Sequence, residues 1–153
     1  MQLLNTNFMM DPILQVISVG IVATIAMTLF SYLFSYLAND NYKEPQLLNY
    51  LIDTLPSVKA SICREHILGW TIHFSIGILF VAVYQILETL AVLDFSIISA
   101  SIFGFIAGLV GIVGWSIGFA VHPSPPKINK LLFFLQLIIA HIIFGGTMGW
   151  LLM

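Results

Sequence analysis

The chain has very few charged residues. Lys, Arg, Asp and Glu make up 8% of its 153 residues, whereas 59% are hydrophobic. Because about 25% of the residues of a soluble domain are charged, this composition excludes an ordinary water-soluble fold. Several uncharged stretches reach the roughly 20 residues that a helix needs to cross a bilayer. The sequence therefore predicts an integral membrane protein, with the lipid bilayer as its first partner.

Cysteine, basic tracts and phosphate-binding loops are scarce or missing. The only cysteine, Cys63, has no second thiol with which to form an intrachain disulfide. The sequence contains no long Lys/Arg run, zinc-finger spacing or glycine-rich phosphate-binding loop, so we expect neither nucleic acid nor a nucleotide as a partner. No Ser, His and acid constellation suggests nucleophilic catalysis, and we assign no catalytic residue.

Four apolar runs predict four membrane-spanning helices within one domain, residues 1-153. Glu88, near the end of the second run, is the only Asp, Glu, Lys or Arg inside them. The predicted spans are 13-37, 67-90, 95-121 and 131-152. The fold class we predict is therefore all-α, an integral membrane four-helix bundle. The short link between the second and third spans predicts that these two are antiparallel neighbours.

The basic residues predict the orientation of the chain. All five Lys and Arg residues fall within two loops, 38-66 and 122-130. Because cytoplasmic loops carry the excess of Lys and Arg, we expect both loops inside and both the N and C termini outside. The first apolar run is too long for a signal-peptide core, so it is expected to remain as a span.

The first loop contains a short amphipathic segment. It opens at Glu44 and Pro45 and is expected to end at Pro56. Between them, five apolar residues recur at helical spacing: Leu47, Leu48, Leu51, Ile52 and Leu55. This spacing predicts a short amphipathic helix at the cytoplasmic interface, packed on the end of the bundle.

All four histidines are placed on predicted helix faces that are rich in glycine. Small residues at such spacing let membrane helices approach closely, so these faces should point into the bundle. His66 and His73 share a face of the second span, His122 follows the third span, and His141 lies in the fourth. We therefore expect an inner pair, His73 and His141, and an outer pair, His66 and His122, near the cytoplasmic boundary.

Ionisable residues inside membrane spans indicate a functional site, and four roles fit these histidines. The first role is to bind a metal ion through His66, His122, His73 and His141. The second is to hold haem b, with His73 and His141 as ligands and with Thr28 and Ser31 orienting them. The third is to line a proton or substrate pathway, and the fourth is only to join helices, as in a structural or accessory subunit with no chemistry of its own. Our working hypothesis is a histidine-lined site for a metal ion or haem b.

Four short motifs resemble those of a loose group of uncharacterised bacterial inner-membrane proteins with four spans. The motifs are Gly20-x-x-Ala-Thr-x-x-Met-Thr28, His66-x-x-Gly-Trp-x-x-His-Phe-x-x-Gly77, His122-Pro123 and His141-x-x-x-Gly145. The resemblance covers most of the chain. It implies a multi-pass protein of the bacterial inner membrane and carries no established activity. The protein contacts we consider are a membrane-protein partner and a homo-oligomer.

Overall fold

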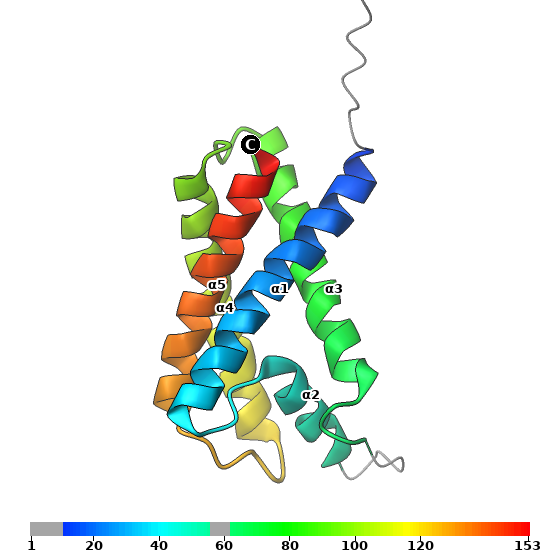
Figure 1. Cartoon of the computed structure of the whole chain (residues 1–153), viewed down its shortest axis with the longest axis vertical. Helices are drawn as coiled ribbons and strands as arrows, with labels where there is room; N and C mark the ends of the chain where they lie inside the picture. The colour runs from blue at the N-terminus through cyan, green and yellow to red at the C-terminus, as the bar shows by residue number, and fades with distance from the viewer. Residues whose placement is uncertain (1–10, 56–61) are drawn as a thin grey trace, which may run out of the picture.

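The computed structural model describes residues 11–55 and 62–153, and all regular structure in these ranges is helical. The helices are α1 (Pro12–Ala38), α2 (Glu44–Asp53), α3 (Ile67–Thr89), α4 (Ile97–Val121) and α5 (Lys130–Leu152) (Figure 1). In this part of the chain, α1, α3, α4 and α5 are each long and apolar enough to cross a membrane. The prediction of an all-α membrane four-helix bundle is confirmed.

Capping residues determine where three of the long helices begin. The Asp11 side chain accepts backbone N–H groups of the first turn of α1, and Pro12 occupies the first helical position. Ser96 caps α4 and Asn129 caps α5 in the same way. These side chains satisfy N–H groups that have no partner within the helix, and a proline at the first position loses no hydrogen bond.

The helices of the bundle differ in how closely they pack on one another. α5 packs along α4 and α1, and α1 packs on α3. α3 and α4 run antiparallel, as predicted, but their packing is slight and includes the contacts of Phe103 in α4 with Phe80 and Tyr84 in α3. Close approach follows the small residues instead. A Cβ added at Gly104 of α4 would collide with the His141 carbonyl oxygen of α5, so only glycine permits this distance.

The short helix α2 was expected at the surface of the bundle end, but several of its side chains are buried. Asn49 is fully buried, and its amide nitrogen donates to the carbonyl oxygens of Arg64 and His66, at 2.8 and 2.7 Å. Its amide oxygen accepts from the backbone N–H of Gly69, at 2.8 Å. These bonds tie α2 to the start of α3. The helix ends at Asp53, and the predicted end at Pro56 lies outside the described residues.

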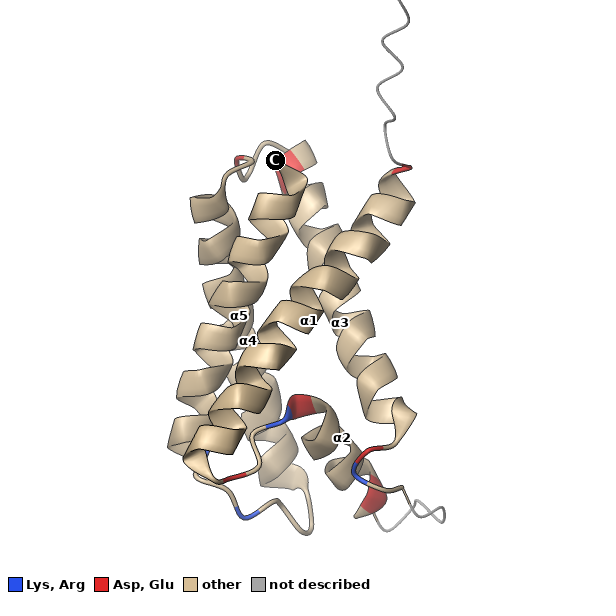
Figure 2. Ribbon diagram, viewed as in Figure 1, with Lys and Arg blue, Asp and Glu red and all other residues tan. Residues whose placement is uncertain are grey.

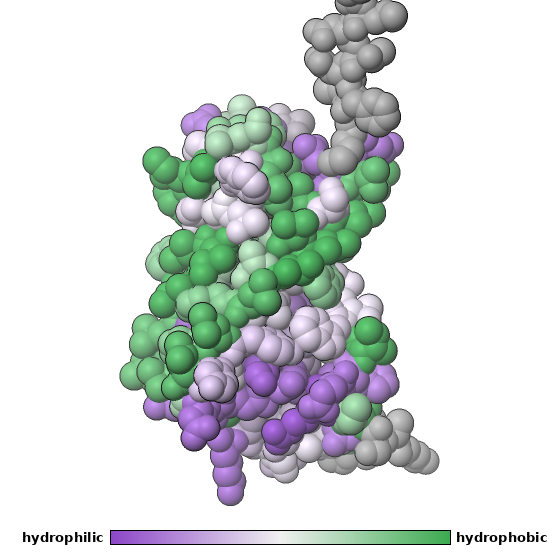
Figure 3. All heavy atoms as spheres, in the orientation of Figure 1, coloured by the Kyte–Doolittle hydropathy of each residue, from purple (hydrophilic) through white to green (hydrophobic). Residues whose placement is uncertain are grey.

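Charge and hydropathy divide the surface along the bundle. The described basic residues lie at the end that holds α2, in the segments before α2, α3 and α5 and at the first residue of α5 (Figure 2). Figure 3 shows hydrophobic side chains over the long helices and hydrophilic ones gathered at the α2 end. Such an apolar belt is what a bilayer requires of the protein surface it surrounds. Lys59, the fifth basic residue, lies outside the described ranges.

Candidate functional site

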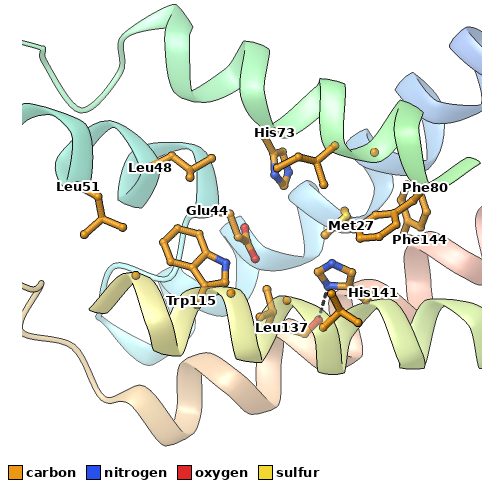
Figure 4. Close-up of a pocket in the computed structure, with 16 residues that line it drawn as sticks. Met27, Glu44, Leu48, Leu51, His73, Phe80, Trp115, Leu137, His141 and Phe144 are labelled. Carbon is orange, nitrogen blue, oxygen red and sulfur yellow. Dashed lines mark hydrogen bonds between the residues drawn. The ribbon is translucent and has the colours of Figure 1, made fainter. Parts of the chain in front are cut away.

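A cavity of about 380 Å³ lies inside the bundle near α2. All five helices contribute to its wall, and Figure 4 shows His73 and His141 projecting into it from α3 and α5. α2 contributes Glu44 and two leucines, and α4 contributes Trp115 and three glycines. We call this space the histidine cavity. Its volume falls in the range of small-molecule sites, which is about 300–1,000 Å³.

One ring nitrogen of His73 is hydrogen-bonded to Thr28 of α1. Its Nε2 lies 3.0 Å from the hydroxyl oxygen of Thr28. That hydroxyl donates its single proton to the Thr24 carbonyl oxygen at 2.6 Å, so it accepts from Nε2–H. A neutral imidazole carries one N–H, and the other ring nitrogen accepts. His73 therefore keeps a free lone pair on Nδ1.

The imidazole of His141 is oriented by its own helix. Its Nδ1 donates to the carbonyl oxygen of Leu137, one turn earlier, at 2.8 Å. The lone pair is then on Nε2, on the side of the ring that faces Gly111 of α4. His73 and His141 are each 8% exposed, so two acceptor nitrogens from different helices are held in one largely buried space.

Glu44, at the start of α2, is the third polar group of the histidine cavity. Its Oε1 accepts from the Ser31 hydroxyl at 2.8 Å and from the Gln136 amide at 2.7 Å. Among the described residues, its Oε2 has no hydrogen-bond partner. Burial raises the pKa of the Glu44 carboxyl, and the bonds from Gln136 and Ser31 oppose this only in part. Burial therefore favours the protonated acid, in which a proton on Oε2 would have no partner among the described residues.

Two of the predicted site residues act elsewhere. His66 is exposed and caps α3, with its Nδ1 accepting from the backbone N–H of Leu68. The expectation that all four imidazoles face the interior was wrong for His66, because α3 begins after this residue and the helical face does not extend to it. His122 is buried but does not line the cavity. Its Nε2 donates to the Leu51 carbonyl oxygen at 2.9 Å, and its Nδ1 accepts from the N–H of Ser124.

The predicted orienting residues have different partners. Thr28 contacts His73, as the prediction requires, whereas Ser31 contacts Glu44 and no histidine. Within residues 11–55 and 62–153, no group of three or more His, Cys, Asp or Glu side chains is arranged to hold a metal ion. A metal site built from all four histidines thus has no support in this geometry.

Sequence reasoning missed Glu44 as a member of the site and Gln136 as its hydrogen-bond partner. Glu44 was interpreted only as the start of a surface helix. Gln136 lies within the first third of the apolar helix α5 and is fully buried. A primary amide in such a run is itself a signal, because it needs hydrogen-bond partners that lipid does not provide.

The chain matches no family model, no curated protein and no solved structure. Membership of the group that its motifs resemble therefore stays a prediction.

Proposed function

We propose that this chain is a multi-pass protein of the bacterial inner membrane that binds a small ligand in the histidine cavity, with loops 38-66 and 122-130 in the cytoplasm. The observation that carries this proposal is the set of unused polar atoms in one cavity. These are Nδ1 of His73, Nε2 of His141 and Oε2 of Glu44. A buried polar atom without a partner costs free energy, so a ligand that supplies partners is stabilised there.

His122 offers an internal comparison. Both of its ring nitrogens are bonded within the protein, to α2 and to the adjacent loop. A histidine that only joins segments of the protein is expected to have both of its ring nitrogens hydrogen-bonded in this way. His73 and His141 line the cavity, and each uses one ring nitrogen for a hydrogen bond within the protein, which leaves the other for a ligand. Thr28 and the Leu137 carbonyl oxygen thereby select the tautomer that a ligand would meet.

Haem b is a second candidate, because it takes axial imidazoles and His73 and His141 project from different helices. The glycine-rich wall of α4 adds space for a flat group. No Lys or Arg is among the residues that line the cavity, so haem propionates would lack basic partners there. A metal ion is less favoured, because it would need ligands beyond the two facing histidines.

The test is to identify what purifies with the protein. Absorption spectroscopy, metal analysis and mass spectrometry of a solvent extract are applied to the wild type, His73→Leu and His141→Leu. We expect a ligand near equimolar amount in the wild type and at least a tenfold loss in both variants. His66→Ala is the matched control, because it removes an exposed imidazole outside the cavity, and it should keep the ligand.

Each readout separates the candidates. A Soret band that both substitutions abolish indicates haem b, and stoichiometric metal without colour indicates a metal ion. If the wild type carries nothing and the two variants lose only thermal stability, the proposed binding role is wrong. The chain is then a structural or accessory subunit whose histidines join helices.

A further inference from the structure

The histidine cavity opens sideways, between α3 and α4. These two helices make few contacts with each other, and cavity residues on both reach the surface. Ile76 of α3 is 42% exposed and Val110 of α4 is 59% exposed. A Cβ added at Gly114 would meet no atom within 4 Å. Because both helices are apolar spans, this opening faces the hydrocarbon of the bilayer rather than water.

The polar groups of the cavity define what a ligand must offer. The free nitrogens of His73 and His141 are acceptors, so each needs a donor. When protonated, the Glu44 carboxyl can donate from Oε2, the oxygen that has no partner among the described residues, and then needs an acceptor. A hydroxyl group both donates and accepts, so a ligand with two hydroxyls satisfies all three groups.

The rest of the wall favours a flat ring. Phe80, Trp115 and Phe144 supply aromatic faces, and Gly111 and Gly118 leave one side of the cavity without bulky side chains. Aromatic rings pack well on such walls. The cavity volume of about 380 Å³ suits a substituted ring, while an apolar tail can leave through the opening between α3 and α4.

We propose that the ligand of the histidine cavity is a lipid-soluble quinol, which enters from the bilayer between α3 and α4. This inference rests on the proposed binding role. The two hydroxyls of the quinol donate to His73 and His141, and one of them accepts from Glu44. The corresponding quinone has carbonyl oxygens and no donor, so it satisfies Glu44 but neither histidine. The proposal concerns binding alone and includes no oxidation step.

The test compares the two redox forms of one compound. The full-length protein in detergent is titrated, without oxygen, with a short-chain naphthoquinol and with its quinone, and binding is followed by tryptophan fluorescence. We expect the quinol to bind at least about tenfold more tightly, because two hydrogen bonds to imidazole are lost with the quinone. His141→Leu should reduce this preference, because only the hydrogen bond to His73 then distinguishes the quinol from the quinone.

A steric variant tests the route of entry. Gly114→Leu places a side chain in the opening where no atom lies near, so the helix itself need not shift. It should weaken quinol binding at least about tenfold. Val113→Leu is the matched control, since Val113 is exposed on α4 and does not line the cavity. It should bind the quinol as the wild type does.

Several outcomes would overturn the inference. Equal affinity for quinol and quinone would show that the imidazoles do not accept from the ligand. Unchanged binding in Gly114→Leu would exclude the side opening. A protein that purifies with haem or metal and binds no quinol would overturn the inference that the ligand is a quinol, but the proposed binding role would stand. A protein that binds nothing would overturn both.

Discussion

At the scale of single residues, the role of each histidine depends on what takes its N–H group. Thr28 accepts from His73, and the Leu137 carbonyl oxygen accepts from His141, so each of these cavity-lining rings keeps one nitrogen that is not hydrogen-bonded to the protein. In His122 the same ring makes hydrogen bonds with both nitrogens and leaves none for a ligand. The difference lies in one neighbouring acceptor or donor and not in burial, because all three side chains are 8% exposed.

Glu44 makes stability depend on pH. Its pKa in the folded protein is raised above the ordinary value of 4.5, mainly by burial. The folded state therefore keeps a proton that the unfolded chain has already released. Stability should be constant below pH 4.5, fall as the pH rises from there to the raised pKa, and level off above it. Glu44→Gln keeps the acceptor oxygen and cannot ionise, so this fall should disappear.

The measurement is the thermal unfolding midpoint of wild type and Glu44→Gln in detergent, from pH 4.5 to pH 8. Glu65→Gln is the matched control, because Glu65 is exposed, and it should retain the wild-type fall. If Glu44→Gln loses stability with pH as steeply as the wild type, Glu44 is not a protonated buried acid.

At the scale of helices, the contact between α4 and α5 depends on particular glycines. A Cβ at Gly145 would collide with the backbone oxygen of Ala100, which cannot rotate away, whereas a Cβ at Gly146 would lie 3.4 Å from the Ser101 hydroxyl. Gly145→Ala should therefore cost about 1–3 kcal/mol of stability, as overpacking in a tight core does. Gly146→Ala, its neighbour on the same helix, should change stability by less than about 0.5 kcal/mol.

Both glycine variants are compared by thermal unfolding in the same detergent. Gly145→Ala should lower the unfolding midpoint, and Gly146→Ala should leave it nearly unchanged. An equal effect of the two substitutions would mean that helix propensity, which improves in both, outweighs the contact with Ala100.

The sequence could predict the helices but not which of them pack together. Lack of charge defined the four spans, and the spacing of leucines defined α2. The spans are apolar on every face, so hydropathy could not tell that α5 rather than α3 would pack along α4. The contact of Thr28 with His73 followed from depth and from a shared small-residue face. Glu44 could not be placed, because its burial depends on how the loop returns α2 into the bundle.

At the scale of the whole molecule, orientation decides which side of the membrane the histidine cavity lies nearest. The described basic residues gather at the end with α2, which also supplies Glu44 and two leucines to the cavity. Cys63, the only cysteine, is exposed in the segment before α3 at that end. The excess of basic residues predicts that this end is cytoplasmic.

Cys63 thus reports orientation without any substitution. A membrane-impermeant maleimide should label it in inverted inner-membrane vesicles and not in intact spheroplasts. Asp94→Cys with Cys63→Ser moves the thiol to the exposed link between α3 and α4, at the opposite end, and should label in spheroplasts only. The reverse pattern would place α2 outside. The cavity would then lie in the outer leaflet half, and any ligand would enter it from that leaflet.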